Sequence, residues 1–203
     1  SKGAARALEG LRSLEKGGHV DATIKWDGSP AIIFGNNEQG EFILTDKSGF
    51  TAKGYDGKPK SPEKLKAMFL DRKGGANKSD PGYVSFANNM KNIFNAYKTA
   101  LPEGFEGYYK GDLLYYTTPP INDDGYFEFT PNIVTYQVKQ DSPLGQKIKA
   151  STTGVVVHRI LDDRGTEVPV TADLNQVFLG DDVFVFPPQS VQKPAKLIEQ
   201  LLI

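Results

Sequence analysis

The chain has 203 residues, of which 38% are hydrophobic, so it can bury one sizeable core, and we expect a single domain over residues 1–203. Its 24 basic residues balance 25 acidic ones, and a net charge of −1 excludes nucleic-acid binding driven by overall charge. The absence of cysteine excludes disulfides and Cys-ligated zinc. We find no run of about 20 apolar residues and no secretory signal, which predicts a cytoplasmic protein without a membrane span.

The first predicted element is a helix over residues 4–15. A pair of glycines, Gly17 and Gly18, follows it and favours its termination. The apolar residues at helical spacing are Ala7, Leu8, Leu11 and Leu14. This helix is expected to pack on the back of a sheet.

A strand, a tight turn and a second strand are predicted next. Apolar and polar residues alternate over residues 20–25, which predicts a strand whose polar face carries Lys25. Residues 27–30 are typical of a turn, and the apolar run 31–34 continues as a strand. This arrangement would hold Lys25 at the mouth of a strand-turn-strand unit. A further strand is expected over residues 41–44.

Two helices are predicted in the middle of the chain. Ser61, Pro62 and Glu63 begin the first, over residues 64–70, and a Gly- and Lys-rich loop over 71–80 follows. The second covers residues 83–101. Its apolar stripe consists of Phe86, Met90, Ile93, Phe94 and Tyr97. That stripe predicts a helix that faces the core.

The remainder of the chain is predicted to be mainly strands. They cover residues 107–115, 126–130, 133–138, 153–161 and 183–186, with a closing helix over 194–202. Runs of strands with segregated helices are typical of an α+β domain with a largely antiparallel sheet.

Basic residues are concentrated between residues 47 and 78. They are Lys47, Lys53, Lys58, Lys60, Lys64, Lys66, Arg72, Lys73 and Lys78. This segment is either an edge that binds nucleic acid or a solvated, mobile insertion, and the sequence favours the second interpretation.

The residues Lys25, Trp26, Asp27 and Gly28 carry the clearest chemical signal. Taken alone, Lys-Trp-Asp-Gly also fits a surface lysine before an Asp-Gly turn. The string resembles motif I of the covalent nucleotidyltransferases, the superfamily of ATP-dependent DNA ligases, RNA ligases and capping enzymes. In that superfamily the motif I lysine takes AMP or GMP as a phosphoramidate.

Three further segments resemble that superfamily in the same order. Residues 45–50 are similar to its Ser-Arg-Asn-Gly segment, with Lys47 in the arginine's place. Residues 107–115 resemble motif III, Gly-Glu-Leu, with Asp112 in the glutamate position. Residues 153–158 resemble motif IV, Glu-Gly-Val-Val-Val-Lys, but Thr153 and His158 replace its two charged residues. The residue two places beyond the motif I glycine, usually arginine in DNA ligases, is Pro30, so the resemblance is to a divergent branch of RNA-ligase or phage-encoded type. No Lys-X-Lys of motif V follows motif IV in order, so we expect that motif V is lost or lies beyond the end of this sequence.

The resemblance implies a two-sheet, ATP-grasp-like ligase adenylation domain with flanking helices. It implies that Lys25 attacks the α-phosphate of ATP and releases pyrophosphate, with Mg²⁺ or Mn²⁺, as the first step of DNA or RNA ligation. Asp112 is the expected metal ligand. The expected nucleotide-binding residues are Thr23, Ile24, Trp26, Asp27, Gly28, Lys47, Lys110, Val155, Val157 and His158. The implied partners are ATP, DNA or RNA ends, and an additional domain or partner chain.

The chemistry of a lysine nucleophile sets its own requirements. An amine with an ordinary pKa near 10.4 is protonated at pH 7, and lowering that pKa by about three units costs roughly 4 kcal/mol. Nearby cations act in that direction, so Lys47 and Lys110 are candidates if their strands converge on Lys25. Alternation places Lys110 and Asp112 on one face of a strand, where they fit either a site or an ordinary cross-strand ion pair.

Two alternatives from other functional classes remain at this stage. The first is a binding or structural module that keeps the fold and binds nucleotide or nucleic acid without reacting, since Thr153 and His158 fit lost catalysis. The second is a plain interaction domain of a virion or complex.

Overall fold

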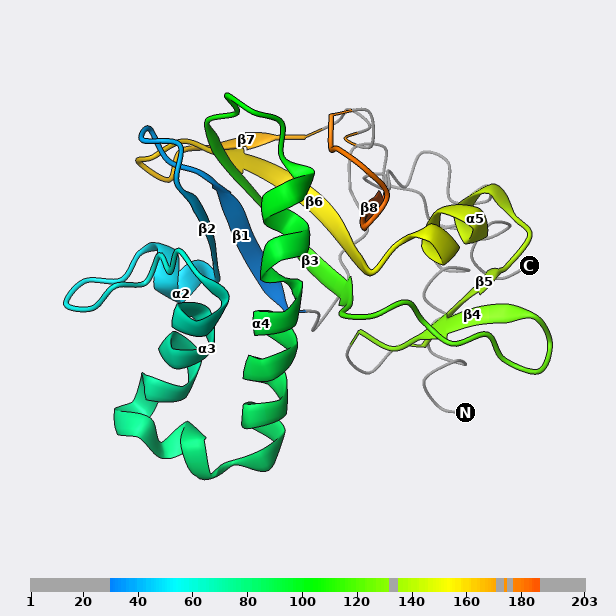
Figure 1. The fold of residues 1–203 in the computed structure, drawn as a ribbon, viewed down its shortest axis with the longest axis horizontal. Coiled ribbons are helices and arrows are strands. Elements are labelled where there is room, and N and C mark those ends of the chain that lie inside the picture. Colours follow the sequence, from blue (N-terminus) through cyan, green and yellow to red (C-terminus); the bar gives the residue numbers. More distant parts are fainter. Residues whose placement is uncertain (1–29, 132–134, 171–173, 175–176, 187–203) are drawn as a thin grey trace, which may run out of the picture.

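The structure is a computed structural model that describes residues 30–131, 135–170, 174 and 177–186. The predicted helix over 4–15, the strand over 20–25, most of the turn at 27–30 and the closing helix over 194–202 lie outside these residues. The described residues form an α+β fold, which confirms the predicted class (Figure 1).

A six-stranded sheet forms the centre of the molecule. Its order is β2-β1-β3-β6-β7, and β8 pairs with β6 beside β7. All of these pairings are antiparallel except β6 with β8, which is parallel. The strands are β1 (Ala31–Asn36), β2 (Phe42–Thr45), β3 (Gly107–Tyr115), β6 (Thr153–Leu161), β7 (Glu167–Pro169) and β8 (Val183–Phe186).

A second, two-stranded sheet lies at one end of the molecule (Figure 1). It pairs β4 (Tyr126–Phe129) with β5 (Tyr136–Lys139), and the helix α5 (Pro143–Ala150) follows. Ser142 begins α5 by accepting a hydrogen bond from the Gly145 N–H, and Pro143 occupies the first turn. The sequence did not predict α5, because its eight residues offer barely two turns of apolar spacing.

The remaining helices lie between β2 and β3 in the sequence. They are α2 (Lys47–Phe50), α3 (Pro62–Asp71), the 3₁₀ segment η1 (Arg72–Ser79) and α4 (Pro81–Ala100). The side chains of Ser61 and Asp80 cap α3 and α4. The prediction of a loop over residues 71–80 was wrong for most of its length, because hydrogen-bonded 3₁₀ turns follow a left-handed bend at Lys73–Gly75.

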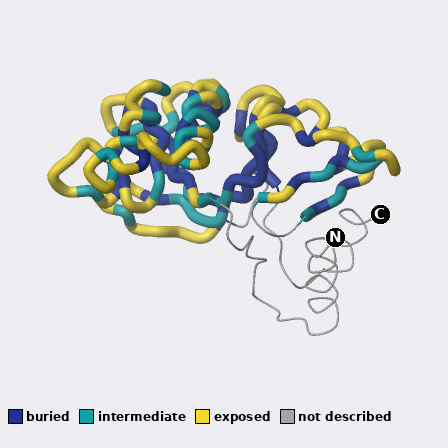
Figure 2. The backbone as a smooth tube through the Cα atoms, turned by 90° about the horizontal axis from the view of Figure 1, so that it is seen from below, coloured by how far each residue is buried: buried dark blue, intermediate teal, exposed yellow. Residues whose placement is uncertain are grey.

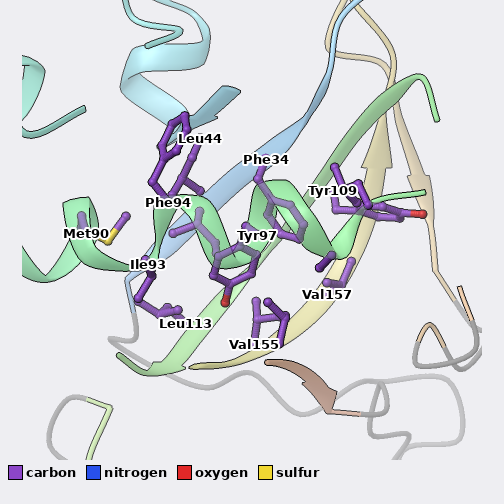
Figure 3. Close-up of a cluster of buried hydrophobic side chains, with 14 of the residues drawn as sticks. Phe34, Leu44, Met90, Ile93, Phe94, Tyr97, Tyr109, Leu113, Val155 and Val157 are labelled. Carbon is purple, nitrogen blue, oxygen red and sulfur yellow. The ribbon is translucent and has the colours of Figure 1, made fainter. Parts of the chain in front are cut away.

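The main core lies between α4 and one face of the central sheet (Figure 3). Phe34 of β1 packs on Tyr97 of α4, with ring centroids 4.7 Å apart, and Phe42 packs on Phe94 at 5.0 Å. The predicted apolar stripe of α4 is therefore confirmed as the face that meets the sheet. Burial is concentrated in the strands and the inner helix face, whereas the connecting segments are exposed (Figure 2).

The opposite face of the central sheet carries two smaller cores. One contains Ile33, Ile43 and Tyr108, with Phe50 and Leu161. The other joins the sheet to β4, β5 and α5. Among the described helices, none has the length and apolar character needed to cross a membrane.

The contact between α4 and the sheet makes a direct stability prediction. Phe94 is fully buried, so Phe94→Ala should lower the free energy of unfolding by about 3–5 kcal/mol through lost burial and a residual cavity. Urea unfolding of the full chain measures this. Lys98→Ala, at an exposed position of the same helix, should change it by less than about 0.5 kcal/mol. Equal effects would contradict the packing of α4 on the sheet.

Candidate functional site

The side of β3 that faces away from α4 carries two charged residues. Tyr109 and Leu113 point into the main core, so Lys110 and Asp112 lie on the other face. This confirms the prediction that they share a face. Both are half-buried, between the two smaller cores.

A β-bulge in β6 adds two more polar residues to this face. The register shifts so that Lys110 pairs with Arg159 but Gly111 pairs with Val157, which leaves His158 as the extra residue. Gly111 is required here, because a Cβ at this position would collide with the carbonyl oxygen of Val156. The bulge turns His158 toward Asp112.

His158 and Asp112 form a partly buried pair. The His158 Nε2 lies 2.9 Å from Asp112 Oδ2, and the side chains are 18% and 23% exposed. Because an ionised carboxylate only accepts hydrogen bonds, Nε2 carries the proton. In the neutral imidazole Nδ1 is then the acceptor, so the pair can hold or move a proton.

A cluster of cations surrounds Glu167 on the same face. Lys110 Nζ lies 2.9 Å from Glu167 Oε1, and Arg159 Nε lies 3.9 Å from Oε2. The hydrogen bond from Lys110, together with the charges of Lys110, Arg159 and Lys47, holds the pKa of Glu167 below its usual range. Three cations around one carboxylate leave an excess of positive charge that favours an anionic ligand. Glu167 was not identified from the sequence, because β7 is only three residues long and was not predicted. Arg159 lies in the predicted strand 153–161, but local alternation could not reveal the bulge that puts it on this face.

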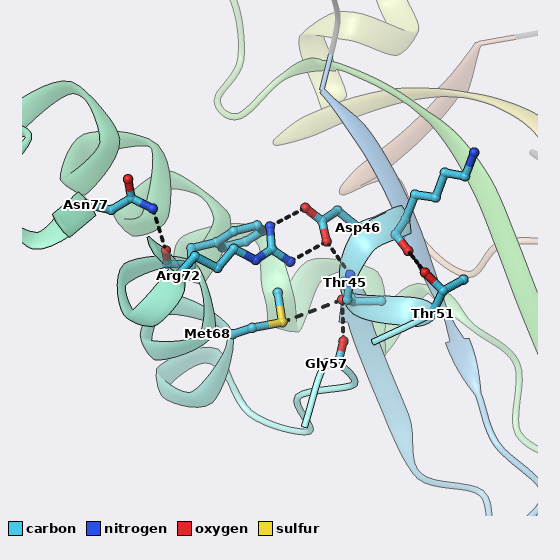
Figure 4. A network of polar contacts seen from close by, with 10 residues as sticks. Thr45, Asp46, Thr51, Gly57, Met68, Arg72 and Asn77 are labelled. Carbon is cyan, nitrogen blue, oxygen red and sulfur yellow. Dashed lines mark hydrogen bonds and ion pairs between the residues drawn. The ribbon is translucent and has the colours of Figure 1, made fainter. Parts of the chain in front are cut away.

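Lys47 is placed by the start of α2, not by the end of a strand. Asp46 caps this helix by accepting a hydrogen bond from the Gly49 N–H at 2.9 Å. Both terminal nitrogens of Arg72 donate to the Asp46 carboxylate at 2.6 Å, which ties α2 to the end of α3 (Figure 4). The buried Thr45 hydroxyl donates to the Gly57 carbonyl and anchors the following loop.

Two of the expected nucleotide contacts lie on the wrong side of the sheet. Val155 and Val157 are fully buried in the main core beneath α4 (Figure 3). They cannot touch a ligand that is bound beside Asp112, because successive residues of a strand point to opposite faces. Thr153, in the position of the motif IV glutamate, is also buried, and its hydroxyl bonds to the Tyr115 carbonyl and the Tyr97 hydroxyl.

The segment that carries the expected nucleophile lies outside the described residues. This applies to Thr23, Ile24, Lys25, Trp26, Asp27 and Gly28. The described chain begins beside Asp112: Ala31 pairs with Asp112, and the Pro30 carbonyl accepts a hydrogen bond from the Leu113 N–H at 2.8 Å. The chain therefore enters the sheet next to the Asp112–His158 pair.

Asp112 and His158 do not form a complete metal site with other residues of the described chain. Within the described part of the chain, no group of three or more His, Asp or Glu residues is arranged to hold a metal ion. Mg²⁺ commonly takes one or two protein carboxylates and completes its shell with substrate phosphates and water. Asp112 fits that more limited role.

These observations define an α+β protein whose central sheet presents a His–Asp pair beside a cationic cluster. The chain belongs to the family of unknown function DUF6267, which it matches over residues 1–60 and 67–189. No curated protein and no solved structure matches the chain.

The Asp46–Arg72 pair predicts a pH-dependent contribution to stability. Burial alone would raise the pKa of Asp46, but hydrogen bonds from Arg72 and Gly49 outweigh it and hold that pKa below the usual range. The stabilisation is present above the ordinary carboxyl pKa of about 3.9 and is lost as the pH falls through the lower folded value. Asp46→Asn should cost roughly 1.5–3 kcal/mol at pH 7, and this deficit should shrink below about pH 4.

Urea unfolding of both chains between pH 2.5 and 7 measures this effect. Asn still caps a helix, so the variant isolates the charge. Asp71→Asn is the matched control, because the Asp71–Lys78 pair is about two-thirds exposed and should contribute little. A deficit at Asp46 that does not change with pH would contradict the assigned ion pair.

Proposed function

We propose that the protein is a nucleotidyltransferase of the polynucleotide-ligase type, in which Lys25 takes AMP from ATP. The observation that carries this proposal is the entry of the chain into β1 beside Asp112 and His158. Lys25 lies five residues before Pro30, and such a segment spans at most about 18 Å. Lys25 is thus within reach of the polar face of the sheet.

The cationic cluster supports a role in holding the triphosphate. Lys110, Arg159 and Lys47 surround a single carboxylate, and a triphosphate would satisfy these cations better than Glu167 does. Positive charge beside Lys25 would also favour its neutral, nucleophilic form. The attack would form a phosphorus–nitrogen bond at the α-phosphate and expel pyrophosphate.

The Asp112–His158 pair takes the place of a carboxylate and a lysine in the resemblance. In this proposal His158 would accept the proton that Lys25 loses, and the hydrogen bond to Asp112 would fix the orientation of the imidazole. Mg²⁺ would supply charge neutralisation of the phosphates, with Asp112 as its protein ligand. The proposal also places the protein in the cytoplasm, or the host cytoplasm if a phage encodes it, where ATP is available.

One observation favours a module that binds nucleotide without reacting. The residue at the position of the metal-holding glutamate is Thr153, whose side chain is fully buried against Tyr97 and Tyr115. A carboxylate at this position would be costly to bury. A direct test for covalent chemistry separates the two functions.

The test is the intact mass of the full chain after incubation with ATP and Mg²⁺ or Mn²⁺. The parent should gain one adenylyl group, and Lys25→Ala should gain none. His158→Ala should label at least about tenfold more slowly, in line with the loss of a positioned base. Asp124→Asn, in an exposed turn, should label like the parent.

Two results would contradict this proposal. Labelling that persists in Lys25→Ala would assign the nucleophile elsewhere. Binding of ATP by calorimetry without any mass gain would instead identify the non-catalytic module.

A further inference from the structure

The basic segment, residues 47–78, concentrates positive charge on one part of the fold. It holds nine of the 24 basic residues but only three of the 25 acidic ones. The rest of the chain therefore has 15 basic and 22 acidic residues. Such an asymmetry within a chain of net charge −1 is typical of a surface that binds a polyanion.

The basic segment is anchored to the core through its helices. It consists of α2, the loop over residues 51–61, α3 and most of η1, and Leu65, Met68 and Phe69 of α3 are buried in the main core. The Arg72–Asp46 pair fastens the end of α3 to α2 (Figure 4). These contacts anchor the helices of the segment to the core, and its interpretation as a solvated, mobile insertion stays a prediction. A prearranged surface loses less conformational entropy when it binds.

A pocket of about 610 Å³ opens between the loop after α2 and the end of α3. Met68 and Pro59 give it an apolar wall, and Lys64 and Lys73 supply positive charge, whereas Arg72 is already paired with Asp46. Tyr55 lines the same pocket and is 48% exposed. The acids Asp56 and Asp71 also contribute, but Asp71 already pairs with Lys78 at 3.1 Å. A flat aromatic side chain beside several cations matches a base and its phosphates.

Lys73 adopts a backbone conformation that costs energy. Its φ is +55° and its ψ is +39°, and two glycines with positive φ follow it. Lysine in the left-handed region is disfavoured by roughly 1–2 kcal/mol, whereas Gly74 and Gly75 adopt it freely. A strained lysine at the rim of a cationic pocket is an observed outlier of the kind that accompanies function.

We propose that the pocket and the adjoining basic segment bind a single-stranded polynucleotide. Lys64 and Lys73 contact the phosphodiester backbone, and Tyr55 stacks against an unpaired base. A small anion would use the pocket alone, whereas the charge extends along the whole segment. The pocket shares no lining residue with the Asp112–His158 face, although Lys47, at the start of the basic segment, also belongs to the cations around Glu167. Binding at the pocket does not depend on whether Lys25 reacts.

The test is fluorescence anisotropy of the full chain with labelled oligothymidylate and oligouridylate at several salt concentrations. Lys64→Glu combined with Lys73→Glu should weaken binding at least about tenfold and flatten the salt dependence by roughly 0.7 per lost phosphate contact. The matched control reverses the charge of two other lysines, as Lys147→Glu combined with Lys149→Glu. Both are exposed on α5 at the other end of the molecule (Figure 1). Equal weakening by the control would overturn the proposal.

Two single variants test the aromatic and the strained residue. Tyr55→Ala should weaken oligonucleotide binding at least about fivefold and leave binding of heparin, which has no bases, unchanged. Lys73→Gly should weaken binding while thermal unfolding shows no loss of stability, because glycine removes the backbone strain. An equal loss of heparin binding in Tyr55→Ala would overturn the stacking role.

The outcome is independent of nucleotidyl transfer. Lys25→Ala should bind oligonucleotide like the parent, even where it accepts no adenylyl group. The deoxyribose and ribose probes separate a DNA-binding from an RNA-binding surface. Failure of both probes to bind would overturn the proposal and leave the Lys25 chemistry to be judged by mass alone.

Discussion

The pairing of β3 with β6 is the constraint on which the rest of the structure depends. These two strands are the longest in the sheet, and their contact joins β1 and β2 on one side to β7 and β8 on the other. The bulge between Lys110 and Gly111 is part of this pairing. It allows the regular side of β6 to face the core while His158 and Arg159 reach the polar side.

The two faces of the central sheet differ in character, since one packs against the main core and the other carries the polar residues of the candidate site. One face is covered by α4 and is apolar around Phe34 and Val157, with the buried Tyr97–Thr153 hydroxyl contact as a polar exception. The other keeps a polar band between two small cores, where Asp112, His158 and the cations meet. A rigid, fully packed face gives the polar groups fixed positions, which an anion-binding or proton-transfer site requires.

Predictions about site residues succeeded where they concerned neighbours within one strand and failed where they concerned contacts between strands. Alternation alone placed Lys110 and Asp112 together, because that relation is local. The same reasoning could not identify Glu167, which reaches Lys110 through a strand that is 57 residues away. Val155 and Val157 were assigned from the resemblance to motif IV together with His158, but strand alternation puts them on the opposite face from it. The expectation about Lys25 concerns residues outside the described structure and stays a prediction.

The sequence by itself determined the local elements. The signals that act over short range are the caps at Ser61 and Asp80, the apolar stripe of α4, and the alternation of apolar and polar residues in β3 and β6. The observed bounds of α3, α4, β3 and β6 lie close to the predicted ones. Tertiary structure decided which of these elements meet. The His158–Asp112, Lys110–Glu167 and Arg72–Asp46 contacts join residues 46, 57 and 26 positions apart. Such contacts arise from strand register and packing, which no local pattern encodes.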